Sequence, residues 1–255
     1  MDDNAPCMIN PLSGVVKYAL GYLSSGRNPH NGVHPSPPGK FTMAASSRPS
    51  QPIKLHTFAL SGHCHRVQLF ASLLNLPVQL IPVDLTQGAH KKPEFLALNP
   101  FGQVPVIEDG EVTLSDSNAI LVYLAGKYDD GQWLPHDPLK AAQVQRWLSA
   151  AAGPLAYGSA ATRVALLFKQ AFNADELTNR AKALFGVMEQ TLAVTPFLTG
   201  STPTLADVAQ YSYVFLAPEG NVSLEAYPQI RAWLARIEAL PGFVPMPQTK
   251  VGLNA

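Results

Sequence analysis

The residues best suited to chemistry lie at the start of the first predicted helix, in Ser61-Gly-His-Cys-His65. Ser61 follows a predicted strand, where a hydroxyl can cap the helix and the helix N-terminus favours an anion. Ser61 and Cys64 have the spacing of a Cys-x-x-Cys redox motif with serine in place of the first cysteine, which argues against dithiol chemistry. A monothiol role for Cys64 stays open beside that of a packed helix cysteine.

The tripeptide His63-Cys64-His65 contains three residue types that can bind a metal ion. Successive residues of a helix point about 100° apart, so these three side chains cannot converge on one ion. A metal site needs its ligands arranged around a single point. We therefore expect no metal site here.

Two further dipeptides, Val104-Pro105 and Asp116-Ser117, lie where a strand and a helix are expected to begin. An X-Pro bond adopts the cis form at little cost, and a helix that opens on Asp-Ser presents free N–H groups to an anion. Each dipeptide also has a purely structural interpretation. Pro105 would then be an ordinary edge-strand proline, and Asp116-Ser117 would only cap the helix.

The elements that position these residues follow from hydrophobic periodicity. Residues 53–58 alternate with period 2 and predict a strand, residues 108–111 predict a hairpin turn, and later segments have a helical period. The predicted order over residues 53–128 is βαβαββα. Beyond residue 132 only helices are expected, at 138–152, 175–194, 205–216 and 228–240. Thr204-Leu-Ala-Asp207 has capping-box spacing, with Asp in place of Glu.

Composition excludes several classes of protein. The chain has 255 residues, 18 Lys+Arg against 18 Asp+Glu, and a formal net charge of zero. Such a chain lacks the basic surface that binds nucleic acid or an anionic membrane. Its two cysteines exclude a disulfide scaffold and fit a reducing compartment. The length allows one large domain or two small ones.

The N-terminal stretch has a different character from the rest of the chain. Residues 27–39 are rich in Pro, Gly and His and lack an apolar period, which is typical of a disordered or linker segment. Asp2 and Asp3 precede the apolar run at 12–23, so an export signal is not favoured. We expect residues 1–50 to be disordered or non-native and to lie outside the fold, with Met43 a plausible alternative start.

Two segments carry a family resemblance. Residues 84–105 read Asp-Leu-Thr-Gln-Gly-Ala-His-Lys-Lys-Pro-Glu-Phe-Leu-Ala-Leu-Asn-Pro-Phe-Gly-Gln-Val-Pro, and residues 114–121 read Leu-Ser-Asp-Ser-Asn-Ala-Ile-Leu. With them, residues 53–245 resemble a cytosolic glutathione transferase of the phi-like or bacterial serine-type. The resemblance implies an α/β thioredoxin-like domain at residues 51–130, an all-helical domain at residues 138–245, a cytoplasmic location and a homodimer.

The resemblance also assigns roles in binding glutathione. Ser61 matches the serine that activates the thiol, and lowering a thiol pKa by about two units needs roughly 2.7 kcal/mol. A charge-assisted hydrogen bond together with a helix terminus supplies free energy of that order. The other matched positions are His90, Lys91, Gln103, Val104, Pro105, Asp116 and Ser117. Asp116 stands where the family usually has Glu.

The second substrate is less defined. We expect its site between the two domains, with Leu60, Trp147, Tyr157 and Arg163 as candidates, although each can equally be a packing residue. The expected reaction conjugates glutathione, as co-substrate and without a further cofactor, to a small electrophile. A glutathione-dependent peroxidase or thiol reductase remains an alternative, and so does a non-catalytic binding module of the same fold.

Overall fold

The computed structural model describes residues 48–255. The predictions made for residues 1–50, including Met43 as an alternative start, therefore lie outside the described residues except at their last three positions. The described residues belong to one compact unit. The division into domains at residues 51–130 and 138–245 stays a prediction. None of the helices in this part of the chain is long and apolar enough to span a bilayer.

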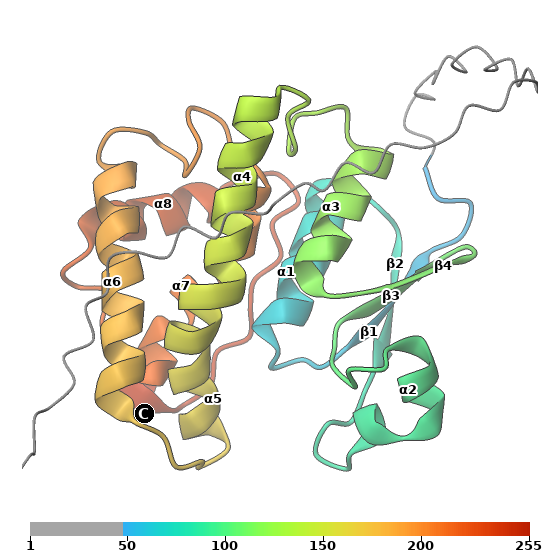
Figure 1. Cartoon of the computed structure of the whole chain (residues 1–255), viewed down its shortest axis with the longest axis horizontal. Coiled ribbons are helices and arrows are strands. Elements are labelled where there is room, and N and C mark those ends of the chain that lie inside the picture. The colour runs from blue at the N-terminus through green and yellow to red at the C-terminus, as the bar shows by residue number, and fades with distance from the viewer. Residues whose placement is uncertain (1–47) are drawn as a thin grey trace, which may run out of the picture. The chain divides into compact units, whose positions relative to one another are not determined.

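The N-terminal half of the fold is built on a four-stranded sheet of order β2-β1-β3-β4 (Figure 1). Strand β1 runs parallel to β2 and antiparallel to β3, and β3 pairs antiparallel with β4. The elements are β1 Ile53–Thr57, α1 Gly62–Leu73, β2 Val78–Pro82, α2 Pro93–Leu98, β3 Val106–Asp109, β4 Val112–Ser115 and α3 Ser117–Tyr128. The predicted βαβαββα order is confirmed, and this half is a thioredoxin-like domain.

Helices cover both faces of the sheet. Strand β3 shows why, because its consecutive residues Val106 and Ile107 are both fully buried but belong to different apolar clusters. Val106 packs with Phe95 of α2, whereas Ile107 packs with the apolar side chains of α1 and α3. A strand buried on both faces reads as a continuous apolar run. Helices α1 and α3 lie on the side of the sheet that faces the C-terminal helices (Figure 1).

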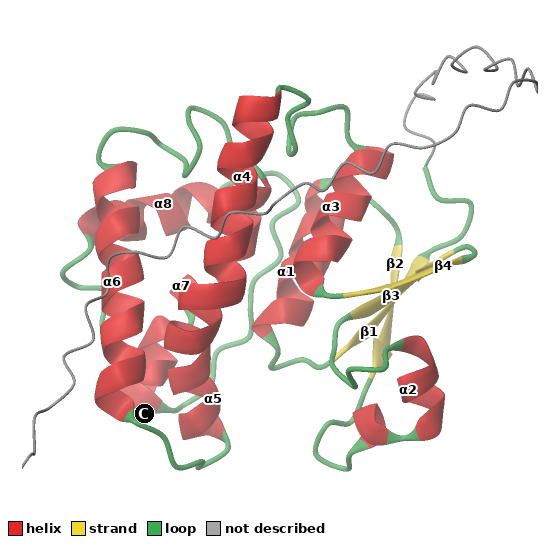
Figure 2. Ribbon diagram, viewed as in Figure 1, coloured by secondary structure: helices red, strands yellow, loops and turns green. Residues whose placement is uncertain are grey.

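The C-terminal half of the described chain is helical (Figure 2). Its helices are α4 Pro138–Ala150, α5 Ala161–Leu167, α6 Ala174–Leu192, α7 Leu205–Phe215 and α8 Pro228–Glu238. Helices α4, α6, α7 and α8 each end within two residues of the predicted end, whereas α5 was not predicted. Helix α7 is buried along most of its length and packs against both α1 and α4.

The helical path does not break after α4, although the sequence contains stop signals there. It continues directly into a π-helical segment, Ala151–Ala160, and then into α5. Gly153 and Pro154 are ordinary stop signals, because proline lacks an N–H and clashes with the preceding turn. The wider π turn accommodates Pro154 without interrupting the helical path from α4 to α5. Such segments are frequent at functional sites.

The predicted hairpin is shifted by two residues at its start. Strand β3 begins at Val106 rather than at 104, since Pro105 has no N–H to give to a strand ladder. The Val104-Pro105 peptide bond is cis. The turn itself is as predicted, with Gly110 at φ 62° between the two strands. This shift leaves the backbone of Val104 outside the sheet ladder.

The capping box at the start of α7 is confirmed and does more than cap. The Asp207 carboxylate, fully buried, accepts hydrogen bonds from the N–H of Thr204 at 2.9 Å and of Leu198 at 2.9 Å. It also accepts one from the Trp233 indole of α8 at 2.9 Å. One carboxylate thus joins α7, α8 and the loop before them.

We predict that Asp207→Asn lowers the free energy of unfolding by about 2–4 kcal/mol, because the amide NH₂ must face a buried donor. Urea denaturation followed by circular dichroism measures the change. The same substitution at Asp137, an exposed cap of α4, serves as the control. It should cost less than about 0.5 kcal/mol, since Asn caps a helix as well as Asp. Equal losses at the two positions would contradict the role of Asp207.

Candidate active site

A cavity of about 970 Å³ opens between the thioredoxin-like domain and the C-terminal helices. Eight residues singled out in the sequence line it together: Ser61, His90, Lys91, Gln103, Val104, Pro105, Asp116 and Ser117. They come from four separate stretches of chain. The fold therefore brings into one cavity the positions that the resemblance connects with glutathione.

Ser61 is the N-cap of α1, with extended backbone angles. Its Oγ accepts a hydrogen bond from the N–H of Cys64 at 3.3 Å, the bond expected of a cap. The hydroxyl proton remains available for a further acceptor, because a serine can donate and accept at once. A negatively charged sulfur in the cavity would also meet the positive end of the α1 dipole.

The loop before β3 offers backbone groups to the cavity. The Asn99 side chain holds this loop by donating to the carbonyl of Gln103 at 2.7 Å and accepting from the N–H of Phe101 at 3.1 Å. The Lys91 ammonium donates to the carbonyl of Gly102 at 3.1 Å. An extended peptide in the cavity could pair with the free backbone of Val104, in the manner of an added strand.

The β4–α3 junction places Asp116 and Ser117 at the cavity as well. Asp116 has φ 71°, a left-handed conformation that is costly for a residue with a side chain. Its carboxylate accepts from the N–H of Ala119 at 2.9 Å, which caps α3. Strain of this kind persists where the surroundings demand it, and here it holds Asp116 at the cavity wall.

Arg66 is a site residue that the sequence reasoning missed. Its guanidinium is only 1% exposed, yet it lines the cavity and donates to the Ser117 hydroxyl and to the Asn118 amide, each at 2.8 Å. Within the described chain its Nε and Nη2 atoms find no hydrogen-bond partner. Burial lowers the pKa of Arg66 to about 10, which still leaves it cationic at neutral pH. The signal that could have indicated this role is an arginine inside a largely buried helix.

His63 lines the cavity as well and was also not predicted. Its Nδ1 lies 3.3 Å from the Ser117 hydroxyl, and its ring meets that of Tyr213 edge to face. Burial, aided by the charge of Arg66, lowers the pKa of His63 to about 3. The imidazole is therefore neutral near pH 7, and Ser117 lies between it and a cation.

The neighbours of His63 turn away from the cavity. Cys64 is 1% exposed, and its sulfur accepts from the N–H of Phe58 at 3.5 Å. Burial raises the pKa of the Cys64 thiol, which makes it a poor nucleophile. His65 uses both ring nitrogens on Ser212 and the Val244 carbonyl. Across residues 48–255 the structure contains no group of His, Cys, Asp or Glu suited to a metal ion.

The four residues considered for the second substrate are divided by the structure. Tyr157, on the π-helical segment, is 62% exposed and lines the cavity. Trp147 is buried and donates from its indole to the Leu198 carbonyl at 3.1 Å. Arg163 is buried in an ion pair with Glu219, and it donates to the Leu60 carbonyl. The helical wall of the cavity is formed instead by Ala152, Ala156, Tyr157, Val164 and Gln170.

Comparison with known proteins agrees with this arrangement. Residues 60–127 match the model of the glutathione S-transferase N-terminal domain, and residues 147–241 match that of the C-terminal domain. The chain belongs to the glutathione S-transferase family. Among its relatives, glutathione S-transferase 3 of Zea mays is 34% identical over 203 residues, which are 75% of this chain and 91% of the maize protein.

Other members of the family are similarly close. Human glutathione S-transferase theta-2B is 31% identical over 200 residues, which are 74% of this chain and 82% of the human protein. Among solved structures, the glutathione S-transferase from Pseudomonas fluorescens superposes with a TM-score of 0.73 at 33% identity, covering 78% of this chain and all of that one. Thus the chain resembles plant, animal and bacterial transferases over the same region.

We predict that the neutral state of His63 makes the stability of the transferase depend on pH. The unfolded chain titrates its histidines near pH 6.5, above the folded pKa of about 3. Unfolding therefore takes up a proton between these pH values, and stability falls as the pH drops through that window. The free energy of unfolding, measured by urea titration at several pH values, should show this slope.

The variant His63→Asn should make that slope shallower by about 1.4 kcal/mol per pH unit, the effect of one proton. The pKa of His65 is also lowered by burial, so part of the slope remains in the variant. If the two proteins had equal slopes between pH 6 and 4, His63 would not be the buried neutral group described here.

Proposed function

We propose that the cavity binds glutathione, that Ser61 stabilises its thiolate, and that the thiolate attacks an electrophilic carbon of a small molecule. The single observation that carries this proposal is the convergence of Ser61, the Val104 backbone and Ser117 on one cavity. These positions offer a donor for the sulfur, a partner for a peptide backbone and a site for a carboxylate.

The proposed binding mode uses each wall of the cavity. The cysteinyl backbone of glutathione pairs with Val104, which lines the cavity together with Pro105. The γ-glutamyl carboxylate binds at the start of α3, where Ser117, the helix terminus and Arg66 favour an anion. Asp116 pairs with the γ-glutamyl ammonium group. His90, Lys91 and Gln103 hold the glycine end.

Charge supports the position of the carboxylate. Arg66 donates to two neutral side chains and keeps two buried nitrogens without partners in the described residues. A buried cation whose hydrogen bonds go only to neutral groups is costly, and a bound carboxylate reduces that cost. The Ser117 hydroxyl accepts from Arg66, so its own proton is free to move from His63 to the ligand.

In the proposed reaction, the thiol loses its proton to solvent and the sulfur is held as thiolate by the Ser61 hydroxyl and the α1 N-terminus. The sulfur then forms a bond to the electrophilic carbon, and a leaving group departs or the electron pair moves onto the substrate. The electrophile rests on the wall formed by Ala152, Ala156, Tyr157 and Val164. Ala152 and Ala156 have small side chains, which leaves room for a bulky substrate.

The Ser61 hydroxyl is tested by the variant Ser61→Ala. We expect conjugation of glutathione to a chloronitrobenzene to fall by at least about tenfold, if the hydroxyl supplies more than about 1.4 kcal/mol in the transition state. Ser223→Ala, in an exposed loop, is the matched control and should leave the rate unchanged. An unaltered rate in Ser61→Ala would remove Ser61 from the mechanism.

A redox reaction at Cys64 predicts the opposite result. In that case Cys64→Ser, rather than Ser61→Ala, would abolish activity, and organic peroxide would be reduced faster than the chloronitrobenzene is conjugated. The burial and raised pKa of Cys64 favour conjugation instead. Failure of the unmodified protein to bind immobilised glutathione would contradict both mechanisms. Binding without turnover would favour a non-catalytic binding module.

We further propose that the protein is a cytoplasmic homodimer that needs no cofactor besides glutathione. Phe101 is 78% exposed beside the cavity, and a groove of about 840 Å³ between α4 and α6 has mainly apolar walls. Exposed apolar surface of this kind typically marks an interface. Sedimentation velocity should therefore give twice the mass of one chain. A monomer at micromolar concentration would refute this part of the proposal.

A further inference from the structure

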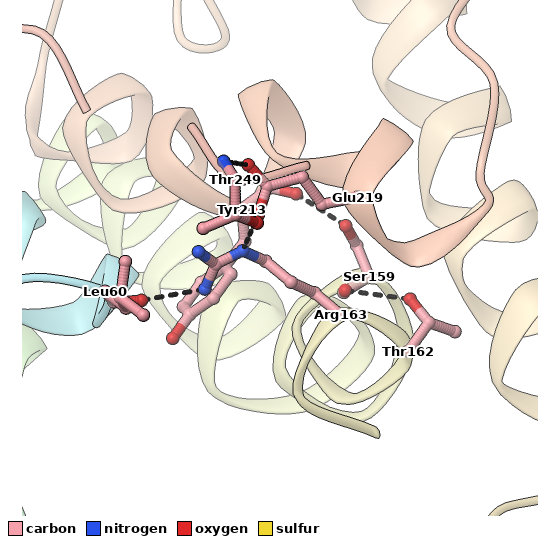
Figure 3. A network of polar contacts seen from close by, with 7 residues as sticks. All are labelled: Leu60, Ser159, Thr162, Arg163, Tyr213, Glu219 and Thr249. Carbon is pink, nitrogen blue, oxygen red and sulfur yellow. Dashed lines mark hydrogen bonds and ion pairs between the residues drawn. The ribbon is translucent and has the colours of Figure 1, made fainter. Parts of the chain in front are cut away.

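The carbonyl group directly before Ser61 is held from the other half of the molecule. Arg163 of α5 donates from Nη1 to the carbonyl oxygen of Leu60 at 2.7 Å (Figure 3). The turn between β1 and α1 has one local backbone bond of its own, from the N–H of Ser61 to the carbonyl of Phe58 at 2.9 Å. Arg163 therefore supplies a long-range bond to the peptide unit that joins Leu60 to Ser61.

Arg163 is itself fixed in place. Its side chain is 1% exposed, and Nε donates to the Glu219 carboxylate at 2.6 Å. Glu219 is fully buried and accepts two more hydrogen bonds from Thr249, one from the backbone N–H at 2.6 Å and one from the hydroxyl at 2.7 Å. The C-terminal segment, Glu219 and Arg163 thus form a continuous polar chain that ends at Leu60 (Figure 3).

The frame around Arg163 is tightly packed as well. The Ser159 hydroxyl donates to the backbone carbonyl of Tyr213 at 2.5 Å, which ties the end of the π-helical segment to α7. Gly220 lies so close to Thr162 that an added Cβ would come within 2.2 Å of its hydroxyl oxygen. The Arg163 guanidinium has little freedom to move, so its hydrogen bond holds the Leu60 carbonyl in one orientation.

A purely structural ion pair does not account for this arrangement. A buried pair of opposite charges contributes little net stability compared with apolar side chains of the same volume. Glu219 neutralises the charge of Arg163, so the pair adds little positive field at the cavity. The effect that remains is the directional hydrogen bond from Arg163 Nη1 to the carbonyl of Leu60, the residue before Ser61.

We propose that Arg163 is a positioning residue that sets the orientation of the Ser61 hydroxyl, with Glu219 and Thr249 as its supports. The proposal rests on the proposed role of Ser61. The peptide plane before Ser61 sets the direction of its N–Cα bond, and the backbone of α1 holds the other side of its Cα. Together they set the Cα–Cβ direction, and hence the distance and angle at which the hydroxyl meets the sulfur. Hydrogen bonds weaken steeply with misalignment, so a small rotation of this plane reduces thiolate stabilisation.

The variant Arg163→Lys separates the two functions of the side chain. Lysine keeps a positive charge beside Glu219 but lacks the planar fork that also reaches Leu60. We expect kcat for conjugation to fall about tenfold and the pKa of enzyme-bound glutathione to rise toward that of free glutathione. The KM for glutathione should change by less than about twofold, since its proposed contacts lie elsewhere. Ultraviolet thiolate absorbance against pH measures the bound thiol.

A second variant guards against poor folding. Thr249→Val removes one donor to Glu219 and keeps the backbone bond and the side-chain volume, so we expect a shift in the same direction with about a threefold loss of kcat. Arg236→Lys is the matched control, because Arg236 likewise donates to a backbone carbonyl, that of Pro196 at 2.9 Å, from α8. It should change neither kcat nor the thiol pKa.

The outcomes distinguish this proposal from the one on which it rests. If Ser61→Ala is inactive while Arg163→Lys and Thr249→Val change only the unfolding midpoint, Arg163 is structural and the positioning role is overturned. If Ser61→Ala keeps full activity, the proposed function of Ser61 fails first. A raised pKa of bound glutathione in folded Arg163→Lys, with KM retained, supports the positioning role.

Discussion

The packing of helix α1 between the sheet and helix α7 is the constraint on which the rest of the structure depends. Eight of its twelve residues are buried, and they include the charged Arg66 and the polar His65. At its first residue, Gly62, an added Cβ would lie 2.8 Å from the Tyr213 ring of α7. The start of α1 therefore cannot move without displacing α7, and Ser61 is held at this immobile end.

Burying a helix that carries polar side chains requires partners for each of them. His65 is satisfied by Ser212 of α7 and by the Val244 carbonyl of the C-terminal segment. Arg66 bonds to Ser117 and Asn118 at the start of α3. The same bonds that compensate these groups align α1 with α3 and α7. The cavity lies where this polar seam reaches the surface, and in the proposed function a ligand carboxylate completes it.

The sequence was informative wherever a signal is local. The alternation of 53–58, the turn around Gly110 and the capping box of Thr204 and Asp207 each depend on neighbouring residues, and each was predicted. The motifs of residues 84–105 and 114–121 located residues of the cavity through their family resemblance, not through a local pattern. These signals were enough for the order of elements and for one face of the site.

Long-range contacts were beyond such reasoning. The sequence suggested Arg163 as a candidate for binding a substrate. Its partners, Glu219 and Leu60, are 56 and 103 residues away in the sequence, so no local pattern indicated them. Arg66 and His63 were missed because their roles depend on Ser117, over 50 residues away. The helix was expected to end near Gly153-Pro154, since nothing local indicates that a π turn can absorb a proline.

The two walls of the cavity obey different physical demands. The wall proposed to bind glutathione consists of a helix N-terminus, a cis-proline loop and a strained Asp116, each with a hydrogen bond inside residues 58–119. Such a wall suits a ligand of constant structure, because each bond has a fixed direction. The helical wall presents Ala152, Ala156, Tyr157 and Val164, which in the proposed function contact the electrophile mainly through shape. Non-directional packing tolerates substrates of different structure.

This difference also explains why a bond between the walls matters. In the proposed reaction, the sulfur held by one wall meets a carbon held by the other. Bringing two reacting atoms into register requires that the walls share a common reference. Arg163 belongs to the helix that follows the substrate wall, and it donates to the residue beside Ser61 on the glutathione wall. Through this contact, the helical side of the cavity is tied to the peptide unit that leads into Ser61.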